Sequence, residues 1–270
     1  MGADATSCCA ETIVDLPGFV ILAAGEYGGE LELLVETTAT EVYCGRCGTR
    51  AAVHDRREHL LGDVPVAGRA TVLVWWKRIW RCPEPVCAVR TWTEQSPLGA
   101  PRQSLTARAK QWVTRRVGAD GETVSSVART LGVGWWSVMR AVIEVGTPLV
   151  DDPDRLADVA GLGVDEHAWQ RANAVRHTRY ATGVVGLRAG RRARLLEVVE
   201  GRSGGVYGEW LAQRPEDWRE QIKVAALDPF RGYLNALREH LPNAAHVLDA
   251  FHVTALGMKV VDEVRRRVQQ

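Results

Sequence analysis

The sequence lacks the long apolar run that a membrane-spanning helix requires. Its longest apolar stretch, around Ile143 and Val145, is interrupted by Glu144, whereas a span needs roughly 20 predominantly apolar residues. The first ten residues contain Asp4 but no lysine or arginine, so the basic segment that begins a secretory signal is missing as well. We therefore expect a cytoplasmic protein with no membrane partner.

The composition also lacks the extremes that mark non-globular chains. Apolar residues make up 46% and charged residues 25% of the 270 residues, which are ordinary values for a globular protein. Wholesale disorder, a collagen-like repeat and a disulfide-dense miniprotein are excluded. The length allows one large domain or two to three small ones.

Basic residues are absent from the acidic segment 1–41, which holds eight acids. By contrast, residues 42–150 hold sixteen lysines and arginines against eight acids, and residues 151–270 hold eighteen against seventeen. A basic block of this size predicts a nucleic-acid surface, because neutralised phosphates release counterions. A solvated charged face is the alternative.

Four of the six cysteines form two close pairs separated by 34 residues: Cys44 with Cys47, and Cys82 with Cys87. In a cytoplasmic chain such pairs indicate a metal site rather than disulfides. Four thiolates can converge tetrahedrally on Zn²⁺ at about 2.3 Å. The pattern predicts a zinc ribbon within residues 42–100, with four reduced, buried cysteines as the alternative.

Other residues fit the ribbon. Gly48 permits a tight turn after the first pair, and residues 70–80, rich in β-branched and aromatic side chains, predict a strand that leads to the second pair. The alternating residues 30–36 predict another strand that packs on the ribbon. His54 could replace one thiolate, whereas Cys8 and Cys9 have no partner pair.

Residues 101–150 change to a helical pattern. Helices are predicted over 104–116, 123–132 and 133–145, with Ser or Thr at the start of the first two. Gly132 supplies a turn between the second and third helices, and Ala128 is small where they would cross. This arrangement predicts a helix-turn-helix DNA-binding domain.

The third helix of this domain would read the DNA. Trp135, Trp136, Ser137 and Arg140 lie in its N-terminal half, which is the part of a recognition helix that contacts base edges. The alternative is an ordinary helical hairpin whose tryptophans belong to the core.

An acidic, proline-bearing linker over 147–154 precedes a pattern that alternates strands and helices. Three strands, a helix, a strand, a helix and a strand follow in order: 159–166, 179–187, 194–200, 204–214, 223–228, 233–240 and 245–251. This order predicts an α/β domain with a ribonuclease-H-like mixed sheet over residues 151–270.

Two acids follow adjacent central strands of that predicted sheet. Asp165 ends the first strand and Asp228 ends the fourth, so their carboxylates would meet at one edge. Paired carboxylates hold the Mg²⁺ ions of two-metal phosphoryl transfer. The alternative is a strand-end aspartate and an Asp-Pro turn residue without a shared role.

From about residue 41 to 270 the chain resembles the ISL3 family of bacterial insertion-sequence transposases. The resemblance rests on the two DNA-binding patterns and on the motifs Gly-Val-Asp165-Glu, Leu-Asp228-Pro-Phe and Leu-Asp249-Ala-Phe-His252-Val. It implies a DDE transposase that binds the terminal inverted repeats of its element, and cleaves and transfers DNA strands with Mg²⁺ or Mn²⁺. Asp165 and Asp228 would be the first two catalytic acids and metal ligands. A homodimer and a nucleoid location follow by the same analogy.

The chain departs from this family at its end. The third catalytic acid of the family is a glutamate on a helix well downstream, whereas this sequence stops at Gln270. Glu263 follows the fifth strand too closely and is expected on a solvated helix. The sequence thus resembles the front part of a transposase with an incomplete catalytic domain, impaired in cleavage. The alternative is a non-catalytic DNA-binding remnant or inhibitor of transposition. Asp249 and His252 receive no role, although Asp249 could offer a metal oxygen.

Overall fold

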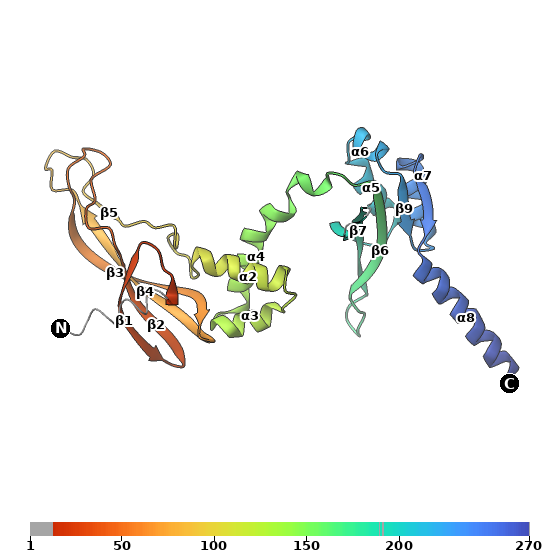
Figure 1. Cartoon of the computed structure of the whole chain (residues 1–270), viewed down its shortest axis with the longest axis horizontal. Helices are drawn as coiled ribbons and strands as arrows, with labels where there is room; N and C mark the ends of the chain where they lie inside the picture. Colours follow the sequence, from red (N-terminus) through yellow and green to blue (C-terminus); the bar gives the residue numbers. More distant parts are fainter. Residues whose placement is uncertain (1–12, 189, 191, 270) are drawn as a thin grey trace. The chain divides into compact units, whose positions relative to one another are not determined.

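The computed structural model describes residues 13–188, 190 and 192–269. It consists of two compact units, and the boundary between them in the sequence falls between Asp151 and Asp152 (Figure 1). Cys8 and Cys9 lie outside the described residues. Within the described residues, none of the helices combines the length and the apolar character that crossing a membrane demands.

A five-stranded sheet forms the first part of unit 1. Its strands run in the order β1-β2-β4-β3, and β5 pairs with β4. Strand β4 is antiparallel to β3 but parallel to β2, with Leu73 opposite Leu33. The predicted strands 70–80 and 30–36 are confirmed, and the second does pack on the strand that leads to the ribbon. The bounds are β1 Phe19–Tyr27, β2 Glu30–Thr37, β3 Ala52–Val66, β4 Arg69–Arg81 and β5 Thr91–Thr93.

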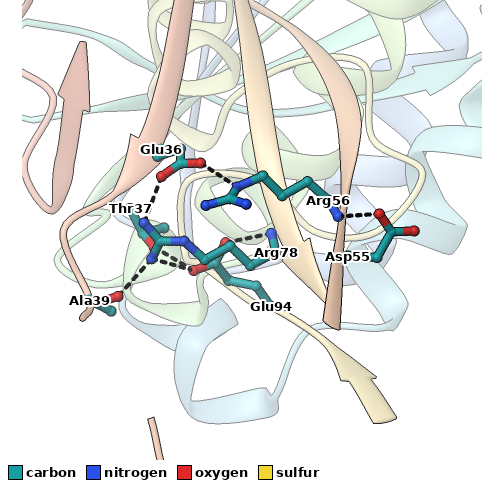
Figure 2. A network of polar contacts seen from close by, with 7 residues as sticks. All are labelled: Glu36, Thr37, Ala39, Asp55, Arg56, Arg78 and Glu94. Atoms are coloured by element: carbon teal, nitrogen blue, oxygen red, sulfur yellow. Dashed lines mark hydrogen bonds and ion pairs between the residues drawn. The ribbon is translucent and has the colours of Figure 1, made fainter. Parts of the chain in front are cut away.

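A polar network holds β2, β3 and β4 together (Figure 2). Glu36 accepts hydrogen bonds from Arg56 and Arg78, each at 2.7 Å. Glu94 accepts the backbone N–H of Arg78 at 3.0 Å and the hydroxyl of Thr37. Burial acts to raise the pKa of Glu36, but the hydrogen bonds and charges of the two arginines outweigh it, and the pKa is lowered from 4.5. The carboxylate is therefore charged at neutral pH and stabilises the sheet.

Three helices complete unit 1: α2 Ala107–Gly118, α3 Val124–Leu131 and α4 Trp135–Val150. The hydroxyls of Thr106 and Thr123 cap the first two by accepting backbone N–H groups, both at 3.1 Å. Gly132 ends α3 with a left-handed φ of 67°, as the turn requires. The helix-turn-helix order is confirmed.

The prediction that a linker begins at residue 147 is wrong, because α4 continues through Pro148 to Val150. The last turns of α4 lie against α2, where Gly146 comes close to the side chain of Thr114. A proline removes one backbone donor from a helix, yet α4 continues for two residues beyond Pro148. The first helix also starts three residues later than predicted, at Ala107, since Thr106 is its cap.

A buried aspartate ties the helices to the sheet. Asp63 on β3 is fully buried and accepts the Thr106 hydroxyl at 2.6 Å and the Arg108 Nε at 2.9 Å. A second Arg108 nitrogen donates to the carbonyl of Val14 at 2.7 Å. A buried carboxylate is stable only with such partners, so the contact fixes the start of α2 on the sheet.

Unit 2 contains the second five-stranded sheet, with the order β10-β9-β6-β7-β8. Strands β6, β7 and β8 are antiparallel neighbours, whereas β9 and β10 run parallel to β6. This is the strand order of the ribonuclease-H-like fold, which confirms the predicted fold class. The strands are β6 Gly161–Gln170, β7 Arg179–Leu187, β8 Arg194–Glu200, β9 Val224–Leu227 and β10 Ala245–Leu248.

Helices α5, α6 and α7 cover one face of this sheet, whereas α8 has no buried residue. The bounds are α5 Gly204–Ala212, α6 Glu216–Glu220, α7 Arg231–His240 and α8 Ala250–Val268. A short 3-10 helix at Pro153–Leu156 precedes the first strand of the unit. Apolar side chains of β6, β7, β8 and β9 pack against α5, α6 and α7 in one core. Tyr233 of α7 is fully buried there, and its hydroxyl lies 2.8 Å from that of Thr182 on β7.

The strand predicted over 245–251 is too long, since β10 ends at Leu248. Asp249 caps α8 by accepting the N–H of Phe251 at 2.8 Å, and the chain turns helical at Ala250. Aspartate before an apolar segment is a typical helix start. The residues that follow β10 therefore lie on a helix rather than on the sheet.

Candidate functional site

The four paired cysteines meet at one point of unit 1. The Sγ atoms of Cys44 and Cys87 are 3.8 Å apart, and those of Cys47 and Cys82 are 3.5 Å apart. All four sulfurs lie within 4.8 Å of one another. Tetrahedral Zn–S bonds of about 2.3 Å place the sulfurs roughly 3.8 Å apart. Donor type and spacing both fit a structural zinc ion held by these residues.

Local backbone turns aim these sulfurs. Gly48 has φ +73° and donates its N–H to the carbonyl of Cys44 at 2.8 Å. Strand β4 ends one residue before Cys82, and the N–H of Cys87 reaches the carbonyl of Glu84 at 3.2 Å. His54, the alternative ligand, is not among the converging groups. Four cysteines, rather than three and a histidine, form the site.

The thiols of the site differ in acidity. A hydrogen bond with Thr49 is the main cause that lowers the pKa of Cys47 to about 6. Burial raises the pKa of Cys82 to about 12. A zinc ion binds thiolates and releases their protons, so the positive charge of the metal is what would keep all four sulfurs ionised together.

The predicted recognition helix presents its tryptophans to solvent. Trp135 is 43% exposed and Trp136 is 65% exposed, and the two rings meet edge to face at 4.9 Å. Arg140 is exposed and Ser137 is half-buried. The alternative that placed both tryptophans in a core is wrong, since the core of these helices uses Val138 and other smaller side chains. This face of α4 is therefore free to contact DNA.

A small groove extends the recognition face. It has a volume of about 130 Å³, and its lining includes Ser137 and Arg140 of α4 together with Arg102 and Gln103 of the preceding turn. Within the described part of the chain, neither arginine forms an ion pair. Arg102 was not among the predicted DNA contacts. The signal in the sequence was a basic residue four positions before Thr106, the cap of α2. In the structure Arg102 lies in a turn with φ +64°.

The two predicted acids of unit 2 lie side by side. Val164 pairs with Leu227 in the parallel register of β6 and β9, so the next residues, Asp165 and Asp228, are neighbours. The prediction that Asp165 ends its strand is wrong, because β6 stays paired with β7 as far as Gln170, whereas Asp228 directly follows β9. Asp165 accepts the N–H of Glu166 at 2.8 Å, and Asp228 accepts that of Phe230 at 3.2 Å. These bonds orient one oxygen of each carboxylate, and the other oxygens remain available.

A histidine completes a cluster with these acids. A ring nitrogen of His252, on the first turn of α8, and carboxylate oxygens of Asp165 and Asp228 all lie within 4.8 Å of one another. Asp249 is not in this cluster, but its Oδ2 is 3.4 Å from Nδ1 of His252. Glu263 is exposed on α8 and lies outside the cluster, in line with its expected place on a solvated helix.

The charge at this edge suits a divalent cation. Neither Asp165 nor Asp228 has a basic partner among the residues that the structure describes. Burial is the main cause that raises the pKa of nearby Tyr233, and the negative charges of Glu166, Asp228 and Asp165 raise it further. Unpaired carboxylate oxygens are the ligands that Mg²⁺ and Mn²⁺ prefer. The residues present therefore fit a divalent metal.

Known families match three successive parts of the chain. Residues 40–87 match the zinc-finger of transposase IS204/IS1001/IS1096/IS1165. Residues 94–146 match the helix-turn-helix domain of transposase family ISL3. Residues 162–270 match the ISL3 DDE family described as transposase. The segments between the matches are short, at residues 88–93 and 147–161.

Curated relatives carry the same description. The transposase for insertion sequence element IS1001 of Bordetella parapertussis is 29% identical over 243 residues, which are 88% of this chain and 56% of the relative. The transposase for IS1557 of Mycobacterium tuberculosis is 25% identical over 83% of this chain and 48% of the relative. The chain thus spans about half the length of these relatives.

Among solved structures, a pre-cleavage Mos1 transpososome covers 57% of this chain and 61% of its own chain, with 12% identity and a TM-score of 0.18. The fold assignment therefore rests on the strand order of unit 2 itself. The three family matches follow one another in a single order and together span far more than half of the sequence. The chain belongs to the ISL3 family of insertion-sequence transposases.

Proposed function

We propose that this protein binds the terminal inverted repeats of an insertion sequence and cleaves and transfers DNA strands at its ends. The observation that supports this most is a pair of carboxylates without a basic partner among the described residues: Asp165 on β6 and Asp228 directly after β9, on neighbouring strands of a ribonuclease-H-like sheet. The same chain carries an exposed recognition helix. Binding to element ends in genomic DNA would place the protein on the nucleoid.

Unit 1 supplies the DNA contacts in this proposal. Arg140 and Ser137 lie on the recognition helix, where arginine can pair with guanine O6 and N7 and serine can bind several bases. Trp135 and Trp136 offer apolar surface for thymine methyl groups. Arg102 contacts the phosphate backbone from the adjacent groove. The zinc ribbon supports β4 and β5 and so maintains the sheet to which α2 is fixed.

Unit 2 supplies the chemistry. When bound, divalent cations such as Mg²⁺ or Mn²⁺ stabilise the charge on the attacking and leaving oxygens of strand cleavage. Asp165 and Asp228 would hold the cation through carboxylate oxygens, which lie within 4.8 Å of each other. The hydrogen bonds from the N–H groups of Glu166 and Phe230 keep those carboxylates oriented for it.

Binding and cleavage can be tested separately. The zinc-loaded protein should bind a duplex with the element's inverted repeat more tightly than an unrelated duplex of the same length. With Mn²⁺ or Mg²⁺, it should nick the repeat end, and Asp165→Asn and Asp228→Asn should abolish nicking while leaving binding intact. Glu220→Gln, which changes an exposed acid of α6, is the matched control. Nicking that survives both aspartate variants would refute the proposed active site.

A second function is favoured by one observation. Among the described residues, the third member of the acidic cluster is a histidine rather than the third carboxylate of a DDE triad. In this alternative the chain binds inverted repeats without cleaving them and blocks an intact transposase. Specific binding without nicking in either cation would support it.

A homodimer that holds two ends at once is part of the first proposal. A second repeat bound per particle, measured by mass photometry, would distinguish it from a monomer.

A further inference from the structure

We infer that His252 is the third protein ligand of the divalent cation, and that Asp249 is the positioning residue that aims its ring. This inference rests on the proposed function, since it concerns the same site. The structure brings a ring nitrogen of His252 within 4.8 Å of carboxylate oxygens of both Asp165 and Asp228. The three residues come from β6, from the end of β9 and from α8.

The surroundings of the imidazole indicate which nitrogen would bind the cation. Nδ1 of His252 is shielded from solvent and has no hydrogen bond among the described residues. It lies 3.4 Å from Oδ2 of Asp249. Metal-bound histidines commonly donate their other ring N–H to a carboxylate, which fixes the ring and raises its basicity. With Nδ1 shielded beside Asp249, Nε2 would be the nitrogen left for the metal.

The position of Asp249 is itself determined by the fold. Its N–H donates to the carbonyl of Leu227 on β9 at 2.8 Å, so it lies next to Asp228 at the sheet edge. Its Oδ1 caps α8 through the N–H of Phe251, which leaves Oδ2 for the imidazole. A single aspartate therefore starts the helix that carries His252 and restrains the ring.

This ligand set changes the expected choice of cation. Mg²⁺ takes oxygen ligands almost exclusively, whereas imidazole binds transition metals well. Two carboxylates and one imidazole should therefore favour Mn²⁺ over Mg²⁺. Removing the imidazole should weaken Mn²⁺ binding by about tenfold or more and change Mg²⁺ binding less. The cation preference of the site would be a property of His252.

Pulsed electron paramagnetic resonance of Mn²⁺ tests this directly, without relying on activity. The zinc-loaded full chain is titrated with Mn²⁺, and electron spin-echo modulation reports any ¹⁴N nucleus bound to the ion. We expect ¹⁴N modulation in the wild type and in His167→Ala, which removes an exposed imidazole two residues from Asp165. We expect its loss in His252→Ala and in His252→Gln, with circular dichroism confirming that both variants are folded.

Asp249→Asn provides the test of the positioning role. Asparagine is as good a helix cap as aspartate, so α8 should be retained, but the charge facing Nδ1 is lost. Mn²⁺ affinity should fall about tenfold and the ¹⁴N coupling should change. Unchanged affinity and coupling would refute a role for Asp249 beyond capping.

The outcomes separate this inference from the proposed function. Mn²⁺ binding that depends on Asp165 and Asp228 but shows no ¹⁴N modulation would overturn only the assignment of His252. Modulation that persists in both His252 variants would do the same. Mn²⁺ binding that survives Asp165→Asn and Asp228→Asn would instead overturn the proposed metal site, and with it the cleavage function.

Discussion

Neutralising Arg102 and Arg140 tests the proposed DNA interface most sharply. Both arginines line the groove beside the recognition helix, and neither forms an ion pair within the described residues. Changing them to glutamine therefore removes a free positive charge without breaking a salt bridge. Such surface changes alter folding stability by at most about 0.5 kcal/mol, so an effect on DNA affinity can be read without a folding correction.

The magnitude follows from counterion release. Each phosphate contact contributes about 0.9 to the slope of log affinity against log salt concentration. When salt is raised from about 50 to 200 mM, a variant that has lost one contact should therefore lose about 3.5-fold less affinity than the wild type. For two lost contacts the difference should be roughly 12-fold. If Arg140 also reads a base, Arg140→Gln should in addition cost about 1–3 kcal/mol of discrimination against unrelated DNA, whereas Arg102→Gln should not.

The assay is fluorescence anisotropy with a labelled inverted-repeat duplex across a salt series. Arg69→Gln is the matched control, because Arg69 pairs with Glu26 at 2.8 Å on the strand side of unit 1. We expect the control slope to equal that of the wild type. Equal slopes for Arg102→Gln, Arg140→Gln and the wild type would show that this groove does not contact phosphates, and the interface would have to lie elsewhere on unit 1.

Three further predictions concern the folded state of unit 1. Gly132→Ala should lower the free energy of unfolding by about 1–3 kcal/mol, because alanine would have to adopt a left-handed backbone conformation and its Cβ would meet the Glu30 carboxylate. In urea unfolding, the double variant with Glu30→Ala should recover part of this loss, and full additivity of the two changes would refute the contact. Glu36→Gln should cost about 2 kcal/mol at pH 7, since it weakens bonds to charged Arg56 and Arg78. The pKa of Glu36 in the folded protein lies below 4.5. The difference in free energy of unfolding between wild type and Glu36→Gln should therefore be present above pH 4.5 and shrink as the pH falls through that pKa. A difference that does not vary with pH would contradict the argument. Removal of zinc with a chelator should lower the melting temperature and weaken binding to the repeat, and both should return when zinc is added; an unchanged melting temperature would mean that the four thiols hold no structural ion.

Pattern alone predicted most elements of unit 2 well. The strands over 179–187 and 194–200 match β7 and β8 at both ends, because both segments are rich in apolar residues and Gly190 and Gly201 mark the turns after them. The strand β3, Ala52–Val66, was not predicted. Its first half is exposed and largely charged, so no apolar period marks it, and it is a strand because β4 offers a long pairing edge.

The acid pair was predicted for a topological reason. Once the strand order was right, parallel register alone brought Asp165 beside Asp228. His252 could not be placed in the same way, because residues 249–251 were assigned to a strand rather than to the start of a helix. Reading Asp249 as a cap would have corrected the boundary. The approach of the first turn of α8 to the acids would still have required the tertiary structure.

The long strand β4 joins the zinc ribbon and the N-terminal hairpin β1–β2 into one sheet. On one edge β4 pairs with β2 through residues 71–75, and on the other with β3 along nearly its whole length. A fragment that begins at residue 42 would leave residues 71–75 of β4 without their partner strand and expose the side chains that pack on buried Leu33 and Val35. Such fragments should aggregate through the open edge. For protein engineers, the smallest transferable DNA-binding module thus runs from β1 to α4, and swapping ribbons between relatives requires exchanging the N-terminal hairpin with them.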